Sequence, residues 1–177
     1  PVAYVIGRIL VVLAVLMLVP AAVDRANGNA RAFLEGAALT GLVGVLMTLA
    51  TRNRIGRALN VRQAILLTFG IWALVPAFGA LPLIWGAPRL GFGDAYFEAV
   101  SGITTTGSTV ITGLDRLPPG MNLWRGLLNW IGGLGIAFIA MIFLPVMRVG
   151  GMQFFRTEGF DTFGKVLLPS AAGVLVY

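Results

Sequence analysis

The sequence predicts an all-α membrane protein, a transmembrane helix bundle interrupted by one re-entrant segment. Composition is the first sign, because 58% of the 177 residues are hydrophobic and only 11% are charged. The mean hydropathy of +0.89 agrees with it. Arrangement is the second sign, since the apolar residues come in long runs rather than in the stripes that a soluble core leaves in a sequence. Lipid is therefore the expected surrounding for most of the chain.

The composition also excludes several kinds of function. The chain has no Cys and no His, so it lacks disulfides, thiolate metal ligands and the commonest general base. We expect no paired carboxylates at membrane depth, and therefore predict neither an enzyme nor a bound cofactor. The net charge of +6 comes from basic residues that flank apolar runs, which is typical of membrane topology rather than of nucleic-acid binding.

Four segments are long and apolar enough to cross a bilayer, which takes about 20 residues. They are residues 5–23, 32–50, 64–85 and 123–147. The connection after the second span is rich in arginine and is predicted to be cytoplasmic. Residues 86–122, between the third and fourth spans, must then begin and end on the outer side. Residues 166–177 are too few to span and are interpreted as the beginning of another helix.

Small residues and prolines predict how these helices pack. Along one face of the second span, small residues recur every four positions, which lets a neighbouring helix approach closely. They are Gly36, Thr40, Gly44 and Thr48. The alternative is that glycine is simply frequent in membrane helices. Pro76 and Pro82 remove backbone donors and should kink the third span or end it early.

Residues 86–122 contain a stretch that is too polar to span and too apolar for a simple loop. We predict a short helix over residues 95–101, with Asp94 as its N-cap and Glu98 in its first turn. A run rich in Thr and Gly follows, over residues 103–109. Non-helical backbone is tolerated at membrane depth only where protein encloses it or where it lines a water-filled cavity. The chain is therefore expected to dip into the membrane and return, the alternative being an ordinary external loop.

A water-filled pore would explain the composition of this run. Consecutive peptide carbonyls can replace the hydration shell of a potassium ion if the backbone adopts conformations that a Cβ often forbids, and Gly107 allows them. The partly negative C-terminal end of the short helix also favours a cation. Glu98 has two interpretations: an ion-attracting carboxylate at the outer mouth or, as we favour, an acid placed in the first turn by the helix dipole.

Glycines in the fourth span are expected to make room for the filter or for the short helix, with general helix packing as the alternative. They are Gly132, Gly133 and Gly135.

The order of these features resembles one repeat of the Trk/Ktr superfamily of potassium transporters, most closely the Trk-type membrane subunit. Residues 97–109, FEAVSGITTTGST, resemble the first pore helix and filter of that family. Residues 129–136, NWIGGLGI, and 150–153, GGMQ, resemble later parts of the same repeat. The resemblance implies an N-terminal helix pair over residues 1–60, a first helix–pore loop–helix repeat over 61–161, and the start of an incomplete second repeat over 162–177.

The resemblance also implies which residues contact the ion. Backbone carbonyls in the filter would bind potassium, with Thr104 at the filter's inner edge. The residues that would contribute them are Thr105, Thr106, Gly107 and Ser108.

As a whole, the resemblance implies potassium uptake, by a symporter or a channel, in a multi-pass protein of the bacterial inner membrane. It further implies a homodimer with a cytosolic nucleotide-binding regulatory subunit. The family places four non-identical repeats around one pore, and one repeat cannot enclose an ion. We therefore expect this sequence to be a piece of a longer protein, with assembly of several copies as the alternative. The competing function is a non-conducting helical scaffold or subunit whose re-entrant loop only packs.

Overall fold

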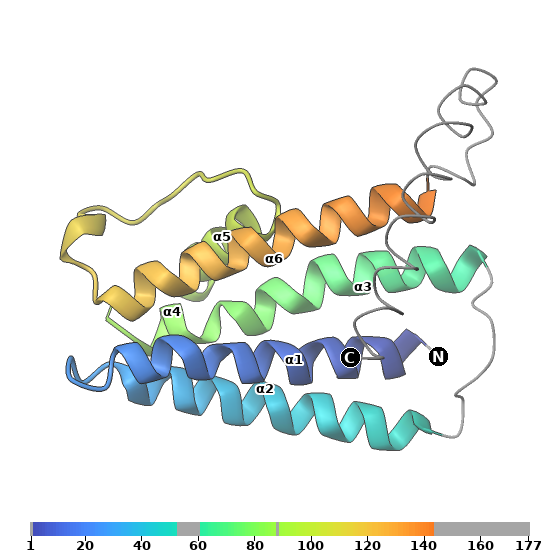
Figure 1. Cartoon of the computed structure of the whole chain (residues 1–177), viewed down its shortest axis with the longest axis horizontal. Coiled ribbons are helices and arrows are strands. Elements are labelled where there is room, and N and C mark those ends of the chain that lie inside the picture. The colour runs from blue at the N-terminus through green and yellow to red at the C-terminus, as the bar shows by residue number, and fades with distance from the viewer. Residues whose placement is uncertain (1, 53–60, 88, 144–177) are drawn as a thin grey trace, which may run out of the picture. The chain divides into compact units, whose positions relative to one another are not determined.

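The computed structural model describes residues 2–52, 61–87 and 89–143, which form helices joined by turns (Figure 1). The helices are α1 (Val2–Val23), α2 (Ala30–Thr51), α3 (Val61–Gly79), α4 (Leu81–Trp85), α5 (Phe92–Ile103), the 3-10 helix η2 (Leu114–Arg116) and α6 (Pro119–Phe143). These described ranges contain no β-strand, which confirms the all-α fold class. The chain divides into two compact units, residues 1–136 and 137–177, and the packing described below lies within the first.

Three helical stretches in the described part of the chain are long and apolar enough to cross a membrane. They are Val2–Val23, Ala30–Thr51 and Arg62–Trp85, with mean hydropathies of 2.7, 1.7 and 2.1. They correspond to the first three predicted spans, and the chain is accordingly an integral membrane protein. The fourth predicted span corresponds to α6, whose 25 residues reach about 37 Å as a helix.

Parts of the predicted organisation lie outside the described residues. These are the end of the fourth span after residue 143, the predicted helix over 166–177 and both predicted domain boundaries, at 60 and 161. They stay predictions.

The third span is broken at its prolines, as predicted. Pro76 lies inside α3, which ends at Gly79, and α4 follows with Pro82 in its first turn. The amide of Ala80 still donates to the carbonyl of Pro76 at 2.8 Å. Because the helix stops at this point, the Gly79 carbonyl is free to accept the indole N–H of Trp124 from α6, at 2.9 Å. The break thus links α3 to α6.

Small residues bring α1 and α2 into backbone contact. A Cβ built on Gly7 would lie 2.8 Å from the carbonyl oxygen of Gly44, and one on Gly44 would lie 2.8 Å from that of Gly7. Gly36 and Thr40, on the same face of α2, are also buried. The predicted packing face of the second span is therefore confirmed.

The segment between α4 and α6 re-enters the bundle. Ile103, the last residue of α5, packs against Gly132, which lies about 20 Å along α6 from Pro119 at a rise of about 1.5 Å per residue. After α5 the chain runs back to η2, at the end of the bundle where α6 begins (Figure 1). The distance from Pro119 to Gly132 is shorter than the roughly 30 Å of hydrocarbon that a spanning helix crosses, so α5 ends inside the bundle, as predicted for a re-entrant helix.

Candidate functional site

The helix that leads to the site begins earlier than the sequence suggests. α5 starts at Phe92 with Gly91 as its N-cap, so the prediction that Asp94 is the N-cap is wrong. Asp94 instead lies exposed in the first turn, where the helix dipole favours an acid. Glu98 consequently belongs to the second turn. The rings of Phe92 and Tyr96 stack with centroids 6.0 Å apart, and this i, i+4 contact stabilises the additional turn.

Backbone hydrogen bonds cap the C-terminal end of α5. In these bonds the amides of the residues that follow donate to carbonyls of the helix. The amide of Thr105 donates to the Gly102 carbonyl at 2.9 Å, and that of Thr106 donates to the Ser101 carbonyl at 3.0 Å. This pair of bonds is a Schellman motif, with Thr105 in the left-handed conformation at φ 57°. A β-branched residue is unusual there and costs about 1–2 kcal/mol. Thr105 therefore holds a backbone conformation in which glycine would be less strained.

The carbonyl oxygens of the next residues have no such partners. Among the described residues we find no hydrogen bond to the carbonyl oxygens of Thr105, Thr106 or Gly107, and all three residues are exposed in this chain. The amide of Gly107 lies 3.4 Å from the Ser101 carbonyl, so it too points back at α5. Donors are used and acceptors are left over, which makes this surface partly negative and suited to a cation.

Gly107 is a glycine for its conformation and not for space. Its φ is 74°, and a Cβ built on it would meet no atom within 4 Å. The same holds for Gly113, beyond the filter, with φ 73° and its nearest neighbour 4.0 Å away. Both positions sit in the left-handed region, where a side chain is strained.

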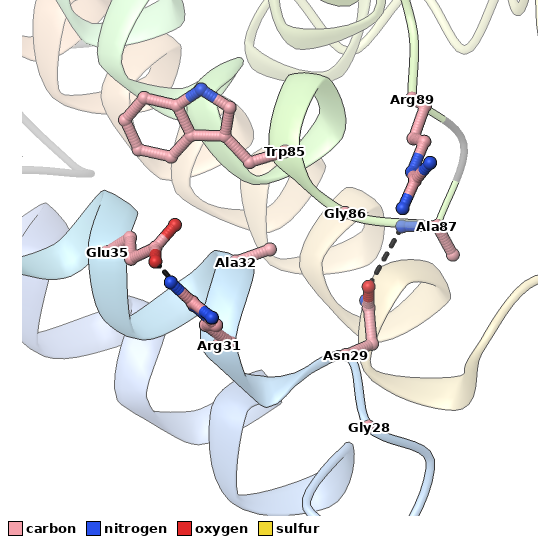
Figure 2. Close-up of a pocket in the computed structure, with 9 residues that line it drawn as sticks. All are labelled: Gly28, Asn29, Arg31, Ala32, Glu35, Trp85, Gly86, Ala87 and Arg89. Atoms are coloured by element: carbon pink, nitrogen blue, oxygen red, sulfur yellow. Dashed lines mark hydrogen bonds and ion pairs between the residues drawn. The ribbon is translucent and has the colours of Figure 1, made fainter.

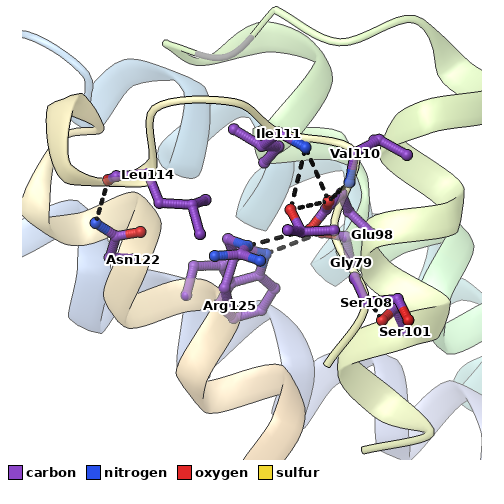
Figure 3. A network of polar contacts seen from close by, with 11 residues as sticks. Gly79, Glu98, Ser101, Ser108, Val110, Ile111, Leu114, Asn122 and Arg125 are labelled. Carbon is purple, nitrogen blue, oxygen red and sulfur yellow. Dashed lines mark hydrogen bonds and ion pairs between the residues drawn. The ribbon is translucent and has the colours of Figure 1, made fainter. Parts of the chain in front are cut away.

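Hydroxyl groups hold residues 104–108, the predicted filter segment, against α5. The Thr104 hydroxyl donates to the carbonyl of Val100 at 2.8 Å and lies 2.8 Å from the hydroxyl of Thr106. The Ser101 hydroxyl donates to the carbonyl of Ser108 at 2.6 Å (Figure 3). The Ser108 carbonyl is therefore directed to α5 and keeps one lone pair, and its predicted part in binding an ion stays a prediction.

Glu98 holds the residues that follow the predicted filter segment. Its side chain is buried, at 1% exposure. One carboxylate oxygen accepts the hydroxyl of Thr109 at 2.5 Å and the amide of Val110 at 2.6 Å, while the other accepts Nε of Arg125 at 3.1 Å (Figure 3). A carboxylate paired in this way is no free charge at an outer mouth. The prediction that the helix dipole places Glu98 in the first turn is wrong, because Glu98 lies in the second turn, where its carboxylate is held by these partners.

The sequence contained a sign of this brace. Glu98 shares one face of α5 with the buried residues Ala95 and Ala99. An acid at that spacing on an apolar face indicates a buried carboxylate that needs partners. The identity of its partner, Arg125, which is 27 residues away in the chain, cannot be read from that pattern.

The three glycines of α6 have different surroundings. A Cβ on Gly132 would collide with the carbonyl group of Ile103, so this glycine makes room for the end of α5. A Cβ on Gly133 would lie 3.7 Å from Cγ2 of Thr105, an ordinary contact with the filter segment. No described atom lies within 4 Å of the Cβ position of Gly135. In this unit Gly135 therefore makes room neither for α5 nor for the predicted filter segment.

Long apolar helices with a short helix that ends inside the bundle define a helical membrane protein with a re-entrant segment. The comparison with known proteins gives the family. Residues 29–176 match the model of the TrkH family, described as cation transport proteins, and the chain belongs to this family.

Several relatives are similar over most of this chain. The Trk system potassium uptake protein TrkI of Halomonas elongata is 38% identical over 98% of the chain and 35% of its own length. TrkH of Escherichia coli K12 is 35% identical over 87% of the chain and 32% of its own length. The crystal structure of the potassium transporter TrkH from Vibrio parahaemolyticus superposes with a TM-score of 0.78 at 34% identity, covering 94% of this chain and 35% of that one. The chain thus spans about a third of the length of these relatives.

Proposed function

We propose that this segment supplies one of the repeats that surround a potassium-conducting pore, with backbone carbonyls of Thr105, Thr106 and Gly107 among the ion ligands. The observation that supports this proposal best is the asymmetry of the turn after α5. Its amides are bonded to the carbonyls of Ser101 and Gly102, whereas its own carbonyls have no partner among the described residues. The printed names of the relatives, which are potassium uptake proteins, agree with it.

The charge distribution around the turn fits a permeant ion. The C-terminal end of α5 brings a partial negative charge to the filter segment, which attracts a cation without trapping it. The full charge of Glu98 is paired with Arg125 and turned to the strand beyond the filter. Discrimination between potassium and sodium would then depend on the number and field of the carbonyl dipoles.

One repeat cannot surround an ion, so the proposal extends to a complete assembly. The remaining repeats come from a longer chain or from further copies of this one, and the shares of 35% and 32% of the relatives' lengths favour a longer chain. We also propose a bacterial inner membrane, a homodimer and a cytosolic nucleotide-binding regulatory subunit, which rest on the family resemblance alone. Passive channel and coupled symporter are both compatible with the geometry.

Two glycines with the same backbone conformation provide a matched test. The two alanine variants, Gly107→Ala and Gly113→Ala, place a Cβ on residues with φ of 74° and 73°. Both should therefore carry a similar backbone strain of about 1–2 kcal/mol. We expect Gly107→Ala, measured in the complete protein in proteoliposomes, to reduce potassium flux or the potassium-to-sodium flux ratio by about tenfold, as a strain of that size at the filter would. Gly113→Ala should leave both near the parent values.

The same measurement separates the alternative. A scaffold whose loop only packs would show no selective flux in the parent protein. If the parent protein conducts and the two variants have equal flux and selectivity, the turn around Gly107 is not the filter.

A further inference from the structure

A second buried polar cluster lies away from the filter, at the turn between α1 and α2. Asp24 is fully buried, at 0% exposure. One of its carboxylate oxygens accepts the amide of Gly120, in the first turn of α6, at 2.8 Å. The other accepts the side-chain amide of Asn29 at 3.1 Å. A carboxylate at this place satisfies one of the orphan amides of α6 and is favoured by the dipole of that helix, although Asp24 lies 96 residues away in the chain, in the turn after α1.

Asn29 continues the chain of hydrogen bonds to another element. Its side-chain oxygen accepts the amide of Ala87, just after α4, at 2.8 Å (Figure 2). A Cβ built on Gly86 would lie 3.1 Å from the same oxygen, so the backbone approaches it closely. Asn29 therefore uses its donor on Asp24 and its acceptor on Ala87, and neither end can be reversed without losing a bond.

The contacts around the other end are equally close. A Cβ on Gly120 would lie 2.6 Å from Cγ of Asp24 and 2.6 Å from the carbonyl oxygen of Pro20. Among the buried side chains of the same unit, Phe33 of α2 packs edge to face on Trp124 of α6, with ring centroids 6.2 Å apart. The beginnings of α2 and α6 are thus joined by packing and, through Asp24, by hydrogen bonds.

The two anchored amides have a particular position in the chain. Ala87 comes directly before the re-entrant segment and Gly120 comes directly after it, so between them lie α5, the filter segment and η2. The helix pair α1–α2 contributes no residue to the filter turn, yet its connecting turn holds both ends of the segment that contains it.

We infer that Asp24 and Asn29 are positioning residues, a hydrogen-bonded bridge that fixes the separation of the two ends of the re-entrant segment and through it the geometry of the filter. This inference rests on the proposed function for its effect on ions. Its effect on the two anchored amides is independent of conduction. It also gives the N-terminal helix pair a role in ion selection from outside the repeat.

The polarity of the bridge supplies a test by exchange of the two side chains. Asp24→Asn alone turns a donor toward the donor of Asn29 and breaks the bridge, and Asn29→Asp alone puts two carboxylates face to face. The double variant Asp24→Asn with Asn29→Asp restores all three bonds, because residue 24 can still accept from Gly120 and donate to residue 29, which accepts from Ala87. Glu35→Gln is the control, since Glu35 pairs with Arg31 at 2.7 Å on the exposed side of α2.

Two readouts are measured on the complete protein. Hydrogen exchange at the amides of Ala87 and Gly120 should rise about tenfold or more in each single variant and return close to the parent rate in the exchanged double variant. The potassium-to-sodium flux ratio in proteoliposomes should fall by about three- to tenfold in the single variants and recover in the double variant. Glu35→Gln should change neither.

The outcomes separate the bridge from the proposed function. Unchanged exchange at both amides in the single variants, or no recovery in the double variant, overturns the bridge whatever the flux shows. Faster exchange with an unchanged flux ratio in a conducting parent overturns its influence on the filter. A parent protein without selective flux contradicts the proposed function, while the exchange rates still decide whether the bridge exists.

Discussion

The interface of α1 with α2 and the re-entrant segment are held together by different interactions. Between α1 and α2 the decisive contact is backbone against backbone at Gly7 and Gly44, with no ion pair across it. The predicted filter segment is held instead by side-chain hydrogen bonds and an ion pair. Most of these interactions involve Glu98 and Ser101, together with an arginine and several hydroxyl groups. A complete helix satisfies its own backbone in lipid and needs only a matching shape. A non-helical turn at membrane depth leaves some backbone N–H and C=O groups without hydrogen-bond partners, and it therefore needs polar side chains nearby.

The largest effect is expected from removing the centre of the polar network. Glu98→Ala leaves the side chain of Arg125 unpaired and deprives the hydroxyl of Thr109 and the amide of Val110 of their acceptor. Loss of one partner of a buried ion pair costs about 3–5 kcal/mol. We expect thermal unfolding in detergent to show a destabilisation of that size and proteoliposomes to show no selective potassium flux.

The exposed ion pair Arg31–Glu35 is the matched control for that variant. Glu35→Gln should leave the melting temperature close to that of the parent, because exposed pairs contribute little. Equal destabilisation by the two substitutions would contradict the bracing role of Glu98.

A smaller effect is expected where α6 makes room for α5. Gly132→Ala drives a Cβ into the carbonyl group of Ile103, which is backbone and cannot swing away. Overpacking of this kind costs about 1–3 kcal/mol and should displace the end of α5, lowering both stability and selectivity. Gly135→Ala, where no described atom lies within 4 Å, should be tolerated in both assays. Matching results for the two alanines would show that α5 does not lean on Gly132.

The interface of α1 with α2 should respond in stability alone. Gly7→Ala would place a Cβ 2.7 Å from the Thr48 hydroxyl and 2.8 Å from the Gly44 carbonyl, at a cost of about 1–2 kcal/mol. We expect a lower melting temperature with an unchanged potassium-to-sodium flux ratio. Gly126→Ala, with open space around it, should keep or slightly raise the melting temperature. A selectivity change in Gly7→Ala would mean that the Gly7–Gly44 contact also affects the filter, and not only the Asp24–Asn29 bridge at the other end of these helices.

The smallest change in stability is expected at the strained threonine. Thr105→Gly relieves the left-handed conformation at φ 57° but also loosens the unfolded chain, so stability should stay within about 1 kcal/mol of the parent. Potassium flux should nevertheless fall, because the variant loses the side chain and the rigidity of the filter. Parent-like flux in this variant would indicate that the threonine serves no function in the turn.

Sequence patterns were sufficient for the parts of the fold that depend on local or periodic features. Run length predicts the spanning helices, the prolines predict the break after Gly79, and the four-residue spacing of small side chains predicts the face of α2 that packs. The Thr and Gly run predicts a non-helical turn at membrane depth. In each case the determining residues are neighbours in the chain.

The sequence was insufficient where side chains meet across the fold. The pairing of Glu98 with Arg125 and the anchoring of Gly120 by Asp24 join residues 27 and 96 positions apart, and only the packing of α1, α5 and α6 brings them together. The bond from Ser101 to the Ser108 carbonyl depends on how the turn folds back on α5. The amino-acid types in this turn do not reveal which of its backbone carbonyls will accept a hydrogen bond.

The position of a bound cation would show whether the backbone carbonyls of the turn after α5 contact the permeant ion. Crystals of the complete protein soaked in rubidium, a heavier ion of the same charge as potassium, would show it by anomalous scattering. The account predicts a peak in contact with the carbonyl oxygens of Thr105, Thr106 and Gly107, whose amides are held by α5. A rubidium peak at the carboxylate of Glu98 instead, or a filter turn whose carbonyls face away from every bound ion, would contradict it.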